Sequence, residues 1–92
     1  MSAFVATRIQ VGDYDTWRPM FEQDRPQARE KATSQRVFRS VDDPNNVFIF
    51  LEFASVPDAQ EAQRRLVESG VLDRFQDKYG PNVIEEVDPG IS

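Results

Sequence analysis

Hydrophobic and polar residues alternate along residues 3–11. Val5, Thr7 and Ile9 fall on one side of an extended backbone, and Phe4 falls on the other. A period of two with β-branched residues is typical of a β-strand. Comparable stretches later in the chain predict three more strands, over residues 34–41, 47–54 and 82–87.

Residues 47–54 are apolar on both sides of the predicted strand. One side carries an aliphatic and aromatic row, Val47, Ile49, Leu51 and Phe53. The other side carries Phe48 and Phe50 before Glu52 interrupts it. A strand with two apolar faces needs cover on both. The turn at residues 42–46 joins this strand to the preceding one and predicts a hairpin.

A first helix is predicted after Gly12. Asp13 or Asp15 can cap its amino end, and Trp17 and Phe21 lie on one helical stripe. Proline is tolerated in the first turn of a helix, so Pro19 favours the later cap. We expect Pro26 to kink or interrupt this helix.

A second helix is predicted from Ser55 to Gly70. Ser55 and Asp58 approximate a capping box, and Gly70 is a typical terminator. Residues 71–79 predict a further short helix with Leu72, Phe75 and Tyr79 on one side, packed in a core or dimer contact. The Gly80-Pro81 pair is expected to end it.

The order of elements is strand, helix, strand, strand, helix, strand. Right-handed crossovers place both helices on one side of a four-stranded antiparallel sheet, which predicts a ferredoxin-like α+β domain over residues 1–92 with strand order 4-1-3-2. The side facing the helices is expected to hold Val5, Ile9, Val37, Val41, Ile49, Leu51 and Phe53. The opposite side is expected to hold Phe4, Ala6, Arg8, Arg36, Phe38, Phe48, Phe50 and Glu52.

No element of the monomer remains to cover this second side. An exposed patch with several phenylalanines is larger than soluble monomers usually tolerate. Stacking the same side of a second copy about a two-fold axis would bury it. We therefore expect a homodimer in which two sheets enclose a barrel, with a cavity for a small molecule beside the interface.

Composition removes several classes of function. The chain has 92 residues, no cysteine, no histidine and a net charge of -5. Nucleic acid and anionic membranes are disfavoured as partners because both require clustered basic residues. Histidine-based catalysis, thiolate nucleophiles and Cys/His zinc sites are excluded. We expect no metal or cofactor, and the sequence lacks a signal peptide or membrane span, so the cytoplasm is the expected location.

Arg8 and Glu52 are the candidate catalytic residues. Neighbouring strands are expected to place them side by side among the aromatic residues, either as a structural ion pair or as groups that meet the polar end of a ligand. The candidate ligand-binding residues are Trp17, Tyr14, Arg36, Phe38, Phe48 and Phe50. For Trp17, a role as a core anchor and a role as a pocket wall both remain open.

Several motifs together resemble one known superfamily. They are Gly12-Asp13-Tyr14-Asp15-Thr16-Trp17, Arg36-Val37-Phe38-Arg39, Asp42-Asp43-Pro44-Asn45, Leu51-Glu52-Phe53, Pro81-Asn82-Val83 and Glu85-Glu86-Val87. They resemble the dimeric α/β-barrel superfamily, and within it the small proteins similar to antibiotic-biosynthesis monooxygenases, some of which are labelled cyclases. The resemblance covers nearly the whole chain.

The resemblance implies a homodimer with a hydrophobic cavity. It also implies, as one option, cofactor-independent oxidation or cyclisation of an aromatic polyketide-like substrate in a dry pocket. Under this option Arg8, Trp17 and Tyr14 would stabilise a substrate anion and Glu52 would accept a proton. Because the chain has no histidine, the haem-degrading activity of some members of the superfamily is not expected here. The other option is a dimer that binds a small apolar or aromatic molecule without catalysis.

Overall fold

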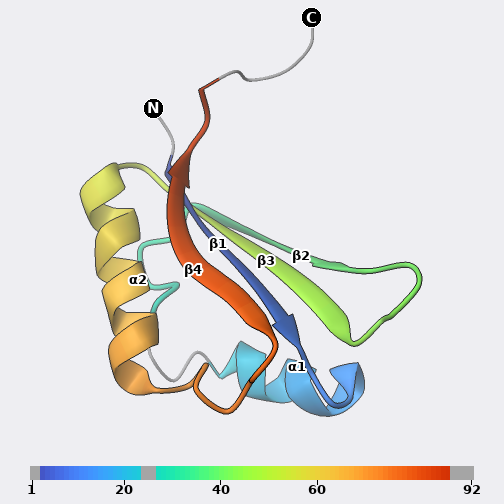
Figure 1. The fold of residues 1–92 in the computed structure, drawn as a ribbon. Helices are drawn as coiled ribbons and strands as arrows, with labels where there is room; N and C mark the ends of the chain where they lie inside the picture. The colour runs from blue at the N-terminus through green and yellow to red at the C-terminus, as the bar shows by residue number, and fades with distance from the viewer. Residues whose placement is uncertain (1–2, 24–26, 88–92) are drawn as a thin grey trace, which may run out of the picture.

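The computed structural model describes residues 3–23 and 27–87. Its elements, in chain order, are β1 (Ala3–Gln10), α1 (Tyr14–Glu22), β2 (Ser34–Arg39), β3 (Asn46–Phe53), α2 (Val56–Ser69) and β4 (Lys78–Glu85). The four strands form one antiparallel sheet in the order β2-β3-β1-β4. Both helices pack on the sheet (Figure 1). The predicted ferredoxin-like α+β fold and its strand order are confirmed.

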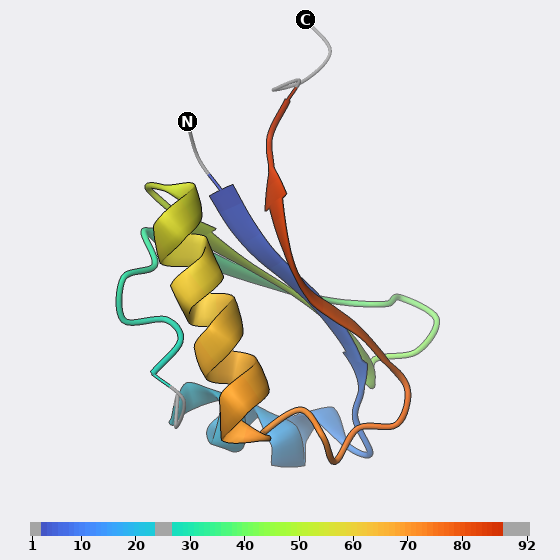
Figure 2. The same cartoon turned by 60° about the vertical axis from the view of Figure 1, so that its left-hand side comes forward.

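The two helices cover the sheet differently. Figure 2 shows α2 running along the sheet while α1 lies across its end. Helix α2 packs against β1, β3 and β4. Helix α2 has both predicted caps. The Ser55 hydroxyl accepts from the Asp58 amide at the amino end, and Gly70 adopts the left-handed conformation at the carboxyl end. None of the helices among residues 3–23 and 27–87 is long and apolar enough to span a membrane.

The side of the sheet that faces the helices forms the hydrophobic core. Burial alternates strictly along β1 and β3, as a strand with one covered face requires. Phe53, Ile9, Val5 and Val47 are the largest fully buried side chains. The expectation that Val41 joins this core is wrong, because β2 ends at Arg39 and Val41 lies fully exposed in the hairpin turn.

The opposite side of the sheet, here called the open face, has no helix over it. Register places its side chains in rows across the four strands, because directly paired residues point to the same side. The open face consists of Phe4, Ala6, Arg8, Ser34, Arg36, Phe38, Phe48, Phe50, Glu52, Tyr79, Asn82 and Ile84. Phe4, Phe48 and Phe50 are only half-buried, and Phe38 and Ile84 are exposed.

Helix α1 begins at the earlier of its two predicted caps. Asp13 is the cap, and its carboxylate accepts from the backbone amide and the hydroxyl of Thr16. The inference from Pro19 to a cap at Asp15 is wrong, because Pro19 lies inside the helix. Its missing amide removes one internal hydrogen bond, which this short helix tolerates. The predicted interruption at Pro26 falls outside the described residues.

Residues 71–77 form turns and bends, so the predicted third helix is absent from this part of the chain. Leu72 is buried and Phe75 packs against the core, but Tyr79 belongs to β4 and points from the open face. Gly80-Pro81 lies within β4 at a register shift opposite Ala6 and Arg8, instead of ending a helix. The strand therefore begins four residues before the predicted one.

Candidate functional site

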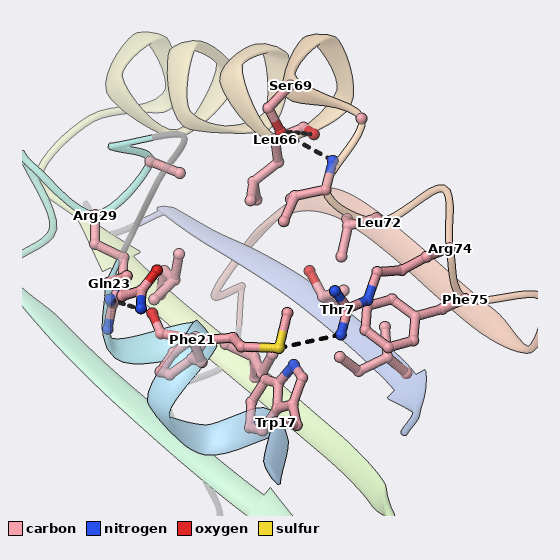
Figure 3. Close-up of a pocket in the computed structure, with 17 residues that line it drawn as sticks. Thr7, Trp17, Phe21, Gln23, Arg29, Leu66, Ser69, Leu72, Arg74 and Phe75 are labelled. Carbon is pink, nitrogen blue, oxygen red and sulfur yellow. Dashed lines mark hydrogen bonds between the residues drawn. The ribbon is translucent and has the colours of Figure 1, made fainter. Parts of the chain in front are cut away.

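A cavity of about 500 Å³ lies between the two helices and the covered side of the sheet. Figure 3 shows side chains from α1, α2, the strands and the 70–77 segment around it. Its lining is mostly aliphatic and aromatic: Thr7, Ile9, Trp17, Met20, Phe21, Gln23, Ala28, Arg29, Ile49, Leu51, Leu66, Ser69, Gly70, Val71, Leu72, Arg74 and Phe75. The volume falls within the range typical of small-molecule sites.

One wall of the cavity is a pair of stacked aromatic rings on α1. The Trp17 and Phe21 ring centroids are 4.9 Å apart with planes 27° apart. Arg29 supports the Phe21 end, with its guanidinium 4.2 Å from the ring centroid and one nitrogen donating to the Phe21 carbonyl at 2.6 Å. A flat apolar surface of this kind favours a planar or aromatic ligand.

Two of the motifs noted in the sequence meet to position this wall. Asn45, in the hairpin turn, accepts from the backbone amide of Tyr14 at 2.9 Å and donates to the Gly12 carbonyl at 3.3 Å. Tyr14 in turn packs on Trp17, with ring centroids 5.7 Å apart. The guanidinium of Arg39 lies 4.5 Å from the Tyr14 ring centroid. The hairpin turn therefore fixes the start of α1 and, through it, Trp17.

Three side chains bring hydrogen-bonding groups to the cavity from different directions. Thr7 lines the cavity from β1 and is 7% exposed. Arg29 is held by Phe21 and by the Gln35 side chain. Arg74 reaches from the 70–77 segment to α1, where it donates to the Met20 sulfur at 3.3 Å.

The described lining residues provide no carboxylate, thiol or imidazole. The shifted pKa values belong to groups outside the lining. Arg18 donates a hydrogen bond to the Glu22 carboxylate, which raises the pKa of Arg18. Hydrogen bonds donated chiefly by Arg64 lower the pKa of Glu61 on α2. The cavity itself is suited to holding an apolar molecule and orienting it by a few polar contacts.

The predicted ligand-binding residues divide between the two sides of the sheet. Trp17 lines the cavity and is also a buried member of the core, so both of its proposed roles describe the same position. Tyr14 packs behind Trp17 and does not line the cavity. The other four predicted residues lie on the open face, away from this cavity: Arg36, Phe38, Phe48 and Phe50.

Arg8 and Glu52 are not side by side, contrary to the prediction. Register pairs Arg8 with Phe48 and pairs Glu52 with Phe4, so the two are offset by four positions along the strands. Arg8 instead donates to the side chains of Asn46 at 3.0 Å and Asp77 at 2.6 Å. Glu52 accepts from the Ser34 hydroxyl. Both lie on the open face, and neither lines the cavity.

Sequence reasoning missed most of the cavity's polar lining. Thr7 was assigned to the covered side of β1, which is correct, but no pattern marked it as bordering a void. Arg29 and Arg74 fall in segments without regular secondary structure, where periodicity carries no information about direction.

Fold and cavity together define a small ferredoxin-like α+β protein with an apolar pocket beneath its helices. Among solved structures, the chain is similar to Rv0793 from Mycobacterium tuberculosis. The two share 13% sequence identity and superpose with a TM-score of 0.68, covering 99% of this chain and 100% of the other. This similarity shows the fold alone. A scan against protein-family models returned no match. A search of curated protein sequences returned none either.

Proposed function

We propose that this protein is a homodimer that binds a small apolar or aromatic molecule in the cavity beneath its helices. The observation that carries the proposal is the cavity itself, about 500 Å³ in volume and walled by Trp17 and Phe21. The cavity opens to solvent beside Met20 and Arg74, so without a ligand its apolar lining is exposed to water, which is unfavourable. A ligand with an apolar ring would displace that water and bury the lining.

The open face supports the dimer part of the proposal. Its half-buried phenylalanines form a contiguous apolar surface, and Phe38 and Phe50 pack edge to face with centroids 5.9 Å apart. The three charged side chains on this face are Arg8, Arg36 and Glu52, so it carries little of the net negative charge of the chain. A second copy can therefore approach it without strong repulsion, whereas the acidic remainder of the surface disfavours contact.

The ligand part is tested with N-phenyl-1-naphthylamine, an uncharged probe that fluoresces in apolar sites. We expect Leu66→Trp, which fills the cavity from α2, to weaken binding about tenfold or more. Its control is Val67→Trp on the same helix, because Val67 is 58% exposed and does not line the cavity. Val67→Trp should bind the probe as the parent does.

Mapping the probe by amide chemical shifts in the parent protein keeps this test decisive if Leu66→Trp folds poorly. Shifts confined to α1 and the 70–77 segment would support the proposal. Shifts confined to β2 would contradict it, because β2 contributes no residue to the described cavity lining.

The dimer part is tested by sedimentation equilibrium. We expect the parent to be dimeric at micromolar concentration and Phe50→Asp to be monomeric, because an unpaired carboxylate at the centre of the contact is costly to bury. Val67→Asp places the same charge on the exposed side of α2 and should leave the dimer intact. A monomeric parent protein would contradict this part of the proposal.

The enzymatic alternative is cofactor-independent monooxygenation or cyclisation of an aromatic polyketide-like substrate. Two observations favour it: the resemblance of the sequence motifs to the dimeric α/β-barrel superfamily, and a largely apolar cavity that would exclude water from a reactive anion. Since the described lining offers no general base, the substrate itself would have to ionise. Oxygen uptake or product formation with polyphenolic substrates, lost in Leu66→Trp but kept in Val67→Trp, would favour this alternative over simple binding.

A further inference from the structure

The cavity has a lining charge opposite to that of the whole chain. Among residues 3–23 and 27–87, no acidic residue lines it, whereas two arginines do. These are Arg29 and Arg74, which lie in different segments. An apolar pocket whose charged lining groups are both cations selects against a cationic ligand and favours an anionic one.

The two arginines differ in what their guanidinium groups already hold. Arg29 donates to the Phe21 carbonyl and the Gln35 side chain and stacks on the Phe21 ring. These contacts hold the cavity wall in place and engage the guanidinium group of Arg29. Arg29 is therefore a support for the wall, and its charge contributes to the potential inside the cavity.

Arg74 holds only weak partners within residues 3–23 and 27–87. One nitrogen donates to the thioether sulfur of Met20 at 3.3 Å, and the guanidinium lies 5.1 Å from the Phe75 ring centroid. It makes no salt bridge to a carboxylate in this part of the chain. A thioether is a poor acceptor, and a guanidinium has five N–H donors, so most of its hydrogen-bonding capacity is unused.

The guanidinium of Arg74, with its free N–H donors, lies at the cavity. Figure 3 shows the side chain extending from the 70–77 segment toward the sulfur atom on α1, above Trp17. Met20 and Arg74 are both exposed, so their contact lies at the solvent side of the cavity. A ligand with its apolar part against Trp17 would leave its polar end at this contact.

We propose that the ligand of the cavity is an apolar or aromatic carboxylate, and that Arg74 binds its carboxylate. The inference rests on the proposed ligand-binding function and adds the chemical class of the ligand. The guanidinium would exchange its contact with the Met20 thioether for a bidentate, charge-assisted hydrogen bond to the ligand carboxylate, which is the stronger interaction.

The test compares a charged probe, 2-naphthoate, with its uncharged methyl ester, methyl 2-naphthoate. Binding is measured as quenching of the single tryptophan, Trp17, which forms the wall. We expect the parent to bind the acid at least tenfold more tightly than the ester at low salt. Arg74→Gln should weaken binding of the acid to the level of the ester and leave the ester unchanged.

Arg36→Gln is the matched control, because Arg36 lies on the open face and its described contact is with the Phe38 ring. It should keep the full preference for the acid. Added salt should reduce that preference in the parent, which supplies a second readout that needs no variant.

Each outcome has a definite meaning. Equal affinity for acid and ester in the parent, with both bound, overturns the inference and leaves the proposed function standing. A preference that Arg36→Gln removes and Arg74→Gln keeps also overturns it. Failure of both probes to bind overturns the proposed function together with the inference.

Discussion

Replacing Asn45 with alanine should loosen the amino end of α1 and the cavity wall that it carries. Asn45 is the point at which the hairpin turn holds this helix. Its side chain accepts from the Tyr14 amide at 2.9 Å and donates to the Gly12 carbonyl at 3.3 Å. The first amides of a helix have no partner within it, so the bond to Tyr14 satisfies a group that the helix itself cannot.

The expected loss follows from those two bonds. Each contributes about 0.5–1.5 kcal/mol net, so Asn45→Ala should lower the free energy of unfolding by about 2 kcal/mol. For a domain of this size that corresponds to a fall in Tm of about 8–16 °C. Asn45→Asp keeps an acceptor for Tyr14 and places a negative charge at a helix amino end, which is favourable. It should therefore lose less than half as much.

Urea unfolding followed by Trp17 fluorescence measures both effects, because the only tryptophan lies one turn from Tyr14. Asp42→Ala is the control: Asp42 is exposed in the same turn and makes no described hydrogen bond or ion pair, so its loss should stay within about 0.5 kcal/mol. The reasoning is refuted if Asn45→Ala unfolds at the urea concentration of the parent. It is also refuted if Asn45→Asp is as damaging as Asn45→Ala.

Three further predictions concern the core, the bulged strand and pH. Phe53→Ala removes a side chain that is 1% exposed and should cost about 3–5 kcal/mol in urea unfolding; a loss below about 1 kcal/mol would contradict its place in the core. Gly80→Ala should lower the free energy of unfolding by at least about 2 kcal/mol, because φ is +87° and the new Cβ would lie 2.4 Å from the Ala6 carbonyl oxygen. In the control, Gly12→Ala, the new Cβ meets nothing within 4 Å and stability should be unchanged. Glu61→Gln should be less stable than the parent at pH 7 and equal to it at pH 2. The pKa of Glu61 is lowered in the folded state, so its contribution is present above the unfolded pKa and lost as pH falls through the folded one; a difference in thermal unfolding that persists at pH 2 would contradict this.

Elements with a strong periodic pattern were predictable from the sequence. The alternation in β1 and β3 identified both strands and the buried side of each, and the second apolar side of β3 identified the open face. Ser55 and Gly70 marked the ends of α2 because capping depends on local backbone chemistry. The order of these elements then restricted the topology to the one observed.

Local patterns failed where tertiary contacts compete with propensity. Leu72, Phe75 and Tyr79 have helical spacing, yet the segment forms turns, and Tyr79 pairs with Arg8 in the sheet. Pro19 suggested a later start for α1, but Asp13 caps the helix, and Asn45 holds its amino end from a distant turn. A hydrogen bond across 31 residues has no signature in local sequence.

The sequence by itself determined the ferredoxin-like sheet, its two apolar sides and the absence of cysteine and histidine chemistry. Only the tertiary structure decided which side holds the cavity and separated Trp17 from the open-face phenylalanines. The reason is that side-chain periodicity shows only which side of its own helix or strand a residue faces. The presence of a cavity depends on the distance between packed helices and strands, which local sequence does not record. Strand register, likewise, is a property of pairing, and it placed Arg8 and Glu52 four residues apart instead of together.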